Sequence, residues 1–156
     1  MKKILAILAV ALAAALAFTS CKKDDVASNT LTIRGAKLNV STAIYAIVQD
    51  EGQGFVNFDI DAGPEATQLH GYGGFPAEYI GKTTPLEGDF FLSFNPMSGP
   101  SIDPVIQSGT VTVTQVSGGK IHVKVDAVET NGEKFIMDCV AYDETQIDDW
   151  EHFQYK

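Results

Sequence analysis

The sequence predicts an all-β domain, an antiparallel β-sandwich of about 7–8 strands. Apolar and polar residues alternate with a period of two through most of residues 31–142, which is the pattern of strands with one buried face. Glycine-containing turns separate these segments, and no long apolar stripe at helical spacing competes with them. An up-and-down β-barrel with a similar number of strands is the alternative, because a meander of hairpins fits either architecture.

The expected strands follow one another along the chain. Val56, Phe58 and Ile60 alternate with polar residues, and residues 110–114 are rich in the β-branched side chains that suit a pleated surface. Residues 69–80 are a candidate for one further strand, interrupted by glycines. The remaining assignments rest on the same alternation, and the expected strands are residues 31–39, 42–49, 54–62, 89–94, 110–116, 120–129 and 133–142.

The turns are explicit in the second half of the chain. Residues 117–119 (Ser-Gly-Gly) and 131–132 (Asn-Gly) tolerate a positive φ, as tight hairpins require. These turns predict a three-stranded antiparallel meander over residues 110–142. Three prolines make residues 95–107 a long connection without strand structure. We expect this connection to cross from one sheet to the other, which favours the sandwich over the barrel.

The first part of the chain predicts a secretory signal peptide. Lys2 and Lys3 precede an apolar run over residues 4–18, which small residues and Cys21 follow. The run is about fifteen residues long, shorter than the roughly twenty that a membrane-spanning helix needs. We therefore expect residues 1–20 to be removed and Cys21 to become the new N-terminus.

This N-terminal segment resembles a bacterial lipoprotein signal. Phe18 stands where leucine is usual, three residues before the cysteine, and this departure resembles the looser signals of the Bacteroidota. The resemblance implies that Cys21 is acylated and anchors the protein to a membrane. The following residues resemble the tag that routes many Bacteroidota lipoproteins to the outer face of the outer membrane: Lys22, Lys23, Asp24 and Asp25. The alternatives are that these charges only solvate a linker, and that the protein faces the periplasm.

Beyond the signal, the order of elements is similar to the small β-rich lipoproteins of the Bacteroidota. The similarity rests on residues 86–90 (Leu-Glu-Gly-Asp-Phe) and 108–113 (Ser-Gly-Thr-Val-Thr-Val), followed by the Gly-Gly and Asn-Gly turns. It implies a surface or periplasm-facing lipoprotein and implies no activity. We accordingly expect a signal peptide in residues 1–20, an acylated cysteine and polar tether in 21–30, and one β-sandwich domain with an acidic C-terminal tail in 31–156.

Charge and cysteine content exclude some partners. Cleavage of the signal peptide, which carries two lysines and no acidic residue, changes the formal net charge from −9 to −11. An acidic surface repels nucleic acid and anionic headgroups, so we expect no nucleic-acid partner and attachment to the membrane through the lipid anchor. With Cys21 acylated, Cys139 has no intramolecular disulfide partner. Its place among alternating apolar residues predicts a small core side chain.

The sequence contains no motif that identifies catalysis, a cofactor or a metal ion. The densest group of potential metal ligands, in residues 148–152, is better explained as a solvated acidic tail. Asp59 and Asp61 share one strand face but lack the closed loop of oxygens that calcium prefers. A hydrolase that uses scattered carboxylates such as Asp59, Asp61 or Glu78 is the least favoured hypothesis. We therefore expect a protein that is not an enzyme and has no cofactor.

One segment, residues 70–79, has the composition of a binding site. Aromatic rings with polar groups beside them suit sugars or peptides, because rings stack on apolar C–H surfaces and polar edges fix the orientation. The candidate ligand-binding residues are Tyr72, Phe75, Tyr79 and, if the tail folds back, Trp150. The alternative is a bent strand whose aromatic side chains pack inward.

Together these observations predict a lipid-anchored, non-enzymatic cell-envelope protein, located at the outer membrane and exposed at the cell surface. Its expected ligand is a glycan, a peptide or an envelope protein. The alternative is a structural or assembly subunit that pairs an exposed strand edge with a partner.

Overall fold

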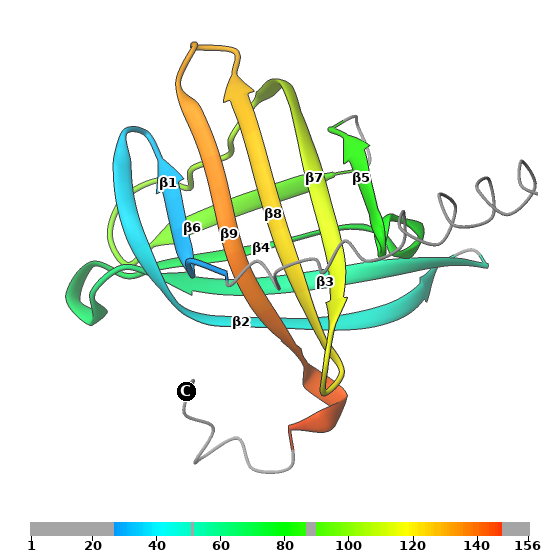
Figure 1. Ribbon diagram of the computed structural model, residues 1–156. Helices are drawn as coiled ribbons and strands as arrows, with labels where there is room; N and C mark the ends of the chain where they lie inside the picture. Colours follow the sequence, from blue (N-terminus) through cyan, green and yellow to red (C-terminus); the bar gives the residue numbers. More distant parts are fainter. Residues whose placement is uncertain (1–26, 51, 87–89, 148–156) are drawn as a thin grey trace, which may run out of the picture.

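The computed structural model describes residues 27–50, 52–86 and 90–147, which form nine β-strands and three short 3₁₀ helices (Figure 1). The strands are β1 (Thr30–Ile33), β2 (Ala36–Asp50), β3 (Gln53–Ala62), β4 (Leu69–Pro76), β5 (Lys82–Pro85), β6 (Phe91–Pro96), β7 (Ile106–Val116), β8 (Lys120–Glu129) and β9 (Lys134–Asp143). The 3₁₀ helices are η1 (Glu65–Thr67), η2 (Ala77–Tyr79) and η3 (Glu144–Gln146). The described ranges contain no α-helix, and the all-β prediction is confirmed.

The nine strands belong to one sheet with the order β5-β7-β8-β9-β1-β2-β3-β4-β6, and all neighbours in this order are antiparallel. The sheet curls so that β2, β3, β4 and β6 cross behind β5, β7, β8 and β9 in Figure 1. A short parallel pairing, Ile44 with Tyr142 and Tyr45 with Asp143, joins β2 directly to β9. The two halves of this curled sheet face each other as the layers of a sandwich do. The sheet also runs without a break from one half to the other, as it would in the barrel-like alternative.

The hydrophobic core lies between the two halves. Inward side chains of β3, such as Phe58, alternate with outward polar ones, and β8 and β9 show the same alternation. The rings of Phe94 on β6 and Phe135 on β9 meet at a centroid distance of 6.0 Å. Cys139 is fully buried in this core, so the prediction of a core side chain is confirmed. Burial, followed by the nearby charge of Asp138, raises the pKa of the Cys139 thiol, and the thiol stays protonated and unreactive.

Several elements differ from those expected, including the bounds of β2, β4 and β6. Residues 31–39 are not one strand, because Arg34 and Gly35 adopt φ values of 48° and 73° and turn the chain between β1 and β2. The four-residue strand β5 has no alternation that would predict it. The predicted meander over 110–142 is confirmed, although β7 already begins at Ile106. The 95–107 connection does join the two halves, from β6 to β7.

The chain that enters β1 is held against the outer side of β9. The Ser28 hydroxyl donates to Oδ2 of Asp138 at 3.0 Å, and the Val140 N–H donates to Oδ1 of Asn29 at 3.1 Å. Asp138 alternates along β9 with buried Met137 and Cys139 and therefore points outward. The first described residues thus lie on the half of the sheet that is opposite to β3, β4 and β6. The expected tether, Cys21, the export tag and Trp150 lie outside the described residues, except for residues 27–30 at the end of the tether.

Candidate functional site

The structure separates the aromatic residues that the sequence grouped together. The side chain of Tyr72 points outward from β4 and is 46 % exposed. Phe75 and Tyr79 are buried, and their rings stack with centroids 6.3 Å apart. The inward-packing alternative therefore describes Phe75 and Tyr79, and neither offers a ring to a ligand at the surface. Among the described candidates, only Tyr72 does so.

Other polar side chains gather around Tyr72 on the outer face of β3, β4 and β6. Strand pairing places Asp59 and Ser93 directly opposite Tyr72, one on each side, and places Asp61 opposite His70. These side chains share one face because residues two apart on a strand point the same way. We call this surface the Tyr72 face, and it consists of Asp59, Asp61, His70, Tyr72, Ser93 and Asp103.

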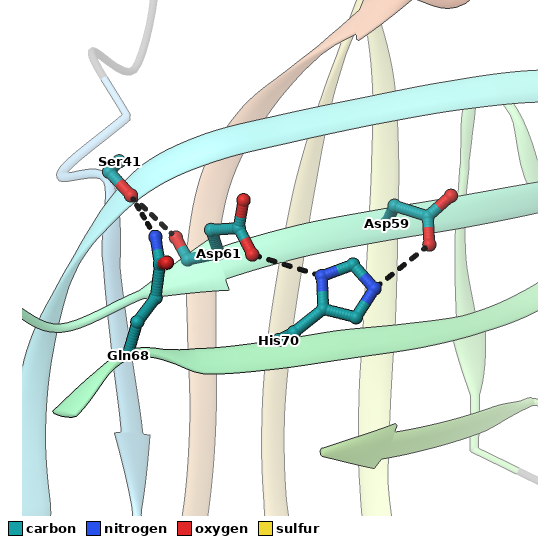
Figure 2. Close-up of polar contacts among 5 residues, drawn as sticks. All are labelled: Ser41, Asp59, Asp61, Gln68 and His70. Atoms are coloured by element: carbon teal, nitrogen blue, oxygen red, sulfur yellow. Dashed lines mark hydrogen bonds and ion pairs between the residues drawn. The ribbon is translucent and has the colours of Figure 1, made fainter. Parts of the chain in front are cut away.

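His70 lies between two carboxylates on this face (Figure 2). Its Nδ1 is 3.0 Å from Oδ1 of Asp61, and its Nε2 is 3.9 Å from Oδ1 of Asp59. Two more hydrogen bonds lie next to Asp61. The Ser41 hydroxyl donates to the backbone carbonyl of Asp61 at 3.2 Å, and the Gln68 side chain donates to the Ser41 hydroxyl at 3.5 Å. All these groups are at least partly open to solvent. The contacts hold both carboxylates against the His70 ring, and Asp59 is the cross-strand neighbour of Tyr72.

On the other side of Tyr72, Ser93 donates a hydrogen bond to Asp103, which lies on the connection after β6. Ser101 donates to the second oxygen of the same carboxylate at 3.5 Å. The connection therefore brings a third carboxylate to the Tyr72 face, from a segment that strand alternation alone does not place.

The end of the face beyond Tyr72 is apolar. Phe55 and Phe91 stack across β4 with ring centroids 6.2 Å apart, and Phe91 is 50 % exposed. Gly74 lies between them, and a Cβ at this position would overlap the Phe55 ring. Glycine is required here because the ring covers the backbone of β4. The surface therefore changes from carboxylates to aromatic rings along its length.

The Tyr72 face is rich in hydrogen-bond acceptors and negative charge. Strands β3, β4 and β6 contain no lysine or arginine. Carboxylates accept hydrogen bonds from hydroxyl groups, while an exposed ring stacks on apolar C–H surfaces. Anionic ligands are disfavoured by the same charges. This combination suits a neutral molecule with many hydroxyl groups.

The arrangement does not assemble a metal centre. Within the part of the chain that the structure describes, no group of three or more His, Cys, Asp or Glu side chains is placed to hold a metal ion. A second polar cluster, His122 with Asp138, lies on the outer face of β8 and β9, far along the sheet from Tyr72. Within the same described ranges, no helix has the length and apolar character to cross a membrane.

Sequence reasoning found Tyr72 but did not join it to the rest of the face. His70, Asp59 and Asp61 were each visible as polar residues on strands, and only the pairing of Asp61 with His70 brings them together. No sequence signal places Ser93 beside Asp103. The chain matched no protein-family model, no curated protein and no solved structure, so the site rests on its own geometry.

Proposed function

We propose that this protein is a lipid-anchored, non-enzymatic protein of the outer membrane that binds a neutral glycan at the cell surface through its Tyr72 face. One observation carries the ligand class. The exposed ring of Tyr72 lies between Asp59 and Ser93, on a face with three carboxylates and no lysine or arginine in its strands. Sugar C–H surfaces stack on such a ring, and sugar hydroxyl groups donate to the carboxylates.

The anchor is supported by the N-terminal sequence and by the place where the chain joins the sheet. Six residues, 22–27, separate the expected acylated Cys21 from Ser28, and even fully extended they span roughly 20 Å. Ser28 is held on the outer side of β9, opposite the half that carries the Tyr72 face. An anchor at Cys21 would therefore direct the Tyr72 face away from the membrane, toward material outside the cell.

A glycan array tests the ligand class. The full chain, purified in detergent, is applied to neutral polysaccharide fragments and to anionic ones that carry sulfate or uronate groups. Binding to neutral glycans is expected, and the affinity of the best one is then measured by calorimetry. Tyr72→Ala should weaken that affinity about tenfold or more, because it removes the stacking surface. Ile47→Ala, at a similarly exposed apolar residue on β2, is the matched control and should leave the affinity unchanged.

Two results would overturn the proposal. One is the absence of any glycan binding at millimolar concentration. The other is a preference for anionic glycans, because three carboxylates cannot favour them. Glycan binding that persists in Tyr72→Ala would place the site elsewhere on the molecule.

A further inference from the structure

Strand β6 is an end strand of the sheet, and only part of its outer edge is covered. One edge pairs with β4 along its whole length. On the other edge, Phe94 exchanges two backbone hydrogen bonds with Ile102, with N···O distances of 2.8 and 2.7 Å. This single bridge is the start of an antiparallel pairing between β6 and the connection that follows it.

Pro104 ends this pairing. Continuing the antiparallel register from Phe94 and Ile102 would place Pro104 opposite Leu92, and proline has no N–H to donate. Backbone groups alternate in direction along a strand, so the N–H and C=O of Leu92 point to the same side as those of Phe94. Within the described ranges, Leu92 has no backbone partner on that side. Among the described residues, the edge of β6 at Leu92 therefore presents one donor and one acceptor without a backbone partner.

A groove of about 490 Å³ opens between the start of β6 and the end of the connection, where the chain enters β7. Its walls are mostly apolar, and its lining includes Leu86, Phe90, Phe91, Val105 and Ile106. Val105 is 59 % exposed and Phe91 is 50 % exposed, so two of the apolar lining residues are open to solvent. The volume is within the range of small ligand sites, roughly 300–1,000 Å³. An unpaired strand edge beside an apolar groove is the arrangement that accepts an added strand.

The charge of the groove indicates what kind of segment it accepts. Asp103 is the only charged side chain among its described lining residues, and Ser93 holds that carboxylate at the rim. The whole chain has a formal net charge of −9, so a second copy would bring like charge to this edge. A peptide with a basic residue next to an apolar one would match the acidic rim and the apolar walls of the groove.

We propose that the groove beside β6 binds an extended peptide segment of another protein, which adds a strand at Leu92. An apolar side chain of the segment would lie between Phe91 and Val105, and a neighbouring lysine or arginine would pair with Asp103. The proposal does not rest on glycan binding, because the peptide pairs with the backbone edge of β6, although Phe91 and Asp103 border both sites.

The test uses the full chain in detergent and a fluorescein-labelled heptapeptide of alternating valine and threonine with lysine at both ends. Two further peptides carry N-methyl groups on one or the other alternate set of backbone amides. An added strand directs only one of these sets toward β6. Fluorescence anisotropy should show binding of the parent peptide and a loss of about tenfold or more for one methylated peptide. The other methylated peptide should bind as the parent does.

Variants of the protein locate the site. Val105→Lys should weaken binding about tenfold, because it fills the groove with a charge that repels the basic peptide. Val116→Lys, at an exposed valine outside the groove, is the matched control and should bind normally. Hydrogen exchange of the segment containing Leu92 should slow when the peptide is added. Tyr72→Ala should not change peptide affinity, which separates this site from the glycan site.

Four results would overturn the proposal. They are no peptide binding at millimolar concentration, equal binding of all three peptides, normal binding to Val105→Lys, and a concentration-dependent dimer that Val105→Lys abolishes. The last result would assign the edge to a second copy of this chain.

Discussion

Asp138 contacts His122 across β8 and β9 although the two residues are not directly opposite. The strand register places Lys124 opposite Asp138, yet the carboxylate Oδ1 lies 2.6 Å from His122 Nε2, one diagonal step away. Ser28 donates to the other carboxylate oxygen. Partial burial raises the pKa of Asp138, but the hydrogen bonds from His122 and Ser28 outweigh burial, and the net effect lowers the pKa below its ordinary value of 3.8.

This lowered pKa predicts a pH-dependent contribution to stability. A carboxyl whose pKa is lower in the folded state stabilises the fold above its unfolded pKa and loses that effect as the pH falls through the folded pKa. Asp138→Asn should therefore be less stable than the parent protein by about 1–2 kcal/mol at pH 7. The difference should disappear between about pH 5 and pH 2. Urea unfolding across this range measures it. A difference for Asp138→Asn that does not change with pH would contradict the assignment.

Glu129 is a buried carboxylate whose replacement should stabilise the protein. It is 5 % exposed at the inward side of β8, and its Oε1 has no hydrogen-bond partner among the described residues. Glu129→Leu removes the unfavourable desolvation of that group and should raise the free energy of unfolding by about 1–3 kcal/mol. The midpoint of urea unfolding reports the change. Glu133→Leu, an exposed neighbour, is the control, and a destabilised Glu129→Leu would contradict the prediction.

Gly71 is a position of close packing in β4. A Cβ there would lie 2.5 Å from the Phe94 ring and 2.7 Å from a methyl group of Ile60. Gly71→Ala should destabilise the fold by about 1–3 kcal/mol, because the core beneath β4 must shift. At Gly54 the nearest contact of a Cβ would be 3.1 Å, to the side chain of Ala77. Gly54→Ala is therefore expected to destabilise the fold less than Gly71→Ala does. Thermal unfolding of both variants measures the difference, and the reverse order would contradict this packing argument.

Thiol counting tests the fate of both cysteines. Cys139 is fully buried with a raised thiol pKa, so a thiol reagent should not label it in the native protein. In denaturant, the membrane-extracted protein should yield one reactive thiol per chain if the Cys21 sulfur carries lipid. Two reactive thiols would contradict acylation, and labelling of native Cys139 would contradict its place in the core.

Removal of the acylation site should release the protein without unfolding it. The described strands begin at Thr30, nine positions after Cys21. Cys21→Ala is therefore expected to move the protein from the membrane to the soluble fraction, with an unchanged far-ultraviolet circular dichroism spectrum. Fractionation of cells that produce each form measures this. Retention of Cys21→Ala in the membrane fraction would contradict the lipid anchor.

The strands that the sequence predicted well are those with both alternation and explicit turns. Residues 120–129 form β8 with the expected bounds because inward Val123 and Val125 alternate with polar residues and Gly119 ends the preceding turn. The turn at Arg34 and Gly35 had a weaker signal, a single glycine, because the φ of 48° at the non-glycine residue is set by the pairing around it. Alternation also cannot show that β1 pairs with both β2 and β9. That pairing makes one curled sheet out of what the sequence suggested as two.

For the site, the sequence could place residues on a face but not beside each other. Tyr72 and Asp59 are thirteen positions apart, and a slip of one residue in the pairing of β3 and β4 would send one of them into the core. The burial of Phe75 follows from alternation once the strand is known, because Phe75 lies three positions from Tyr72 on β4 and so points to the opposite face. Register between strands is a property of the whole sheet, and local composition does not contain it.

The pairing of Leu31 on β1 with Met137 on β9 determines when the protein can fold. Nearly the whole chain must be synthesised before the first strand meets one of its two neighbours, and no shorter fragment can close the curl of the sheet. Contacts between such distant residues form slowly. A chain that stays open until its last long strand arrives keeps the two halves of its core apart until synthesis is nearly finished.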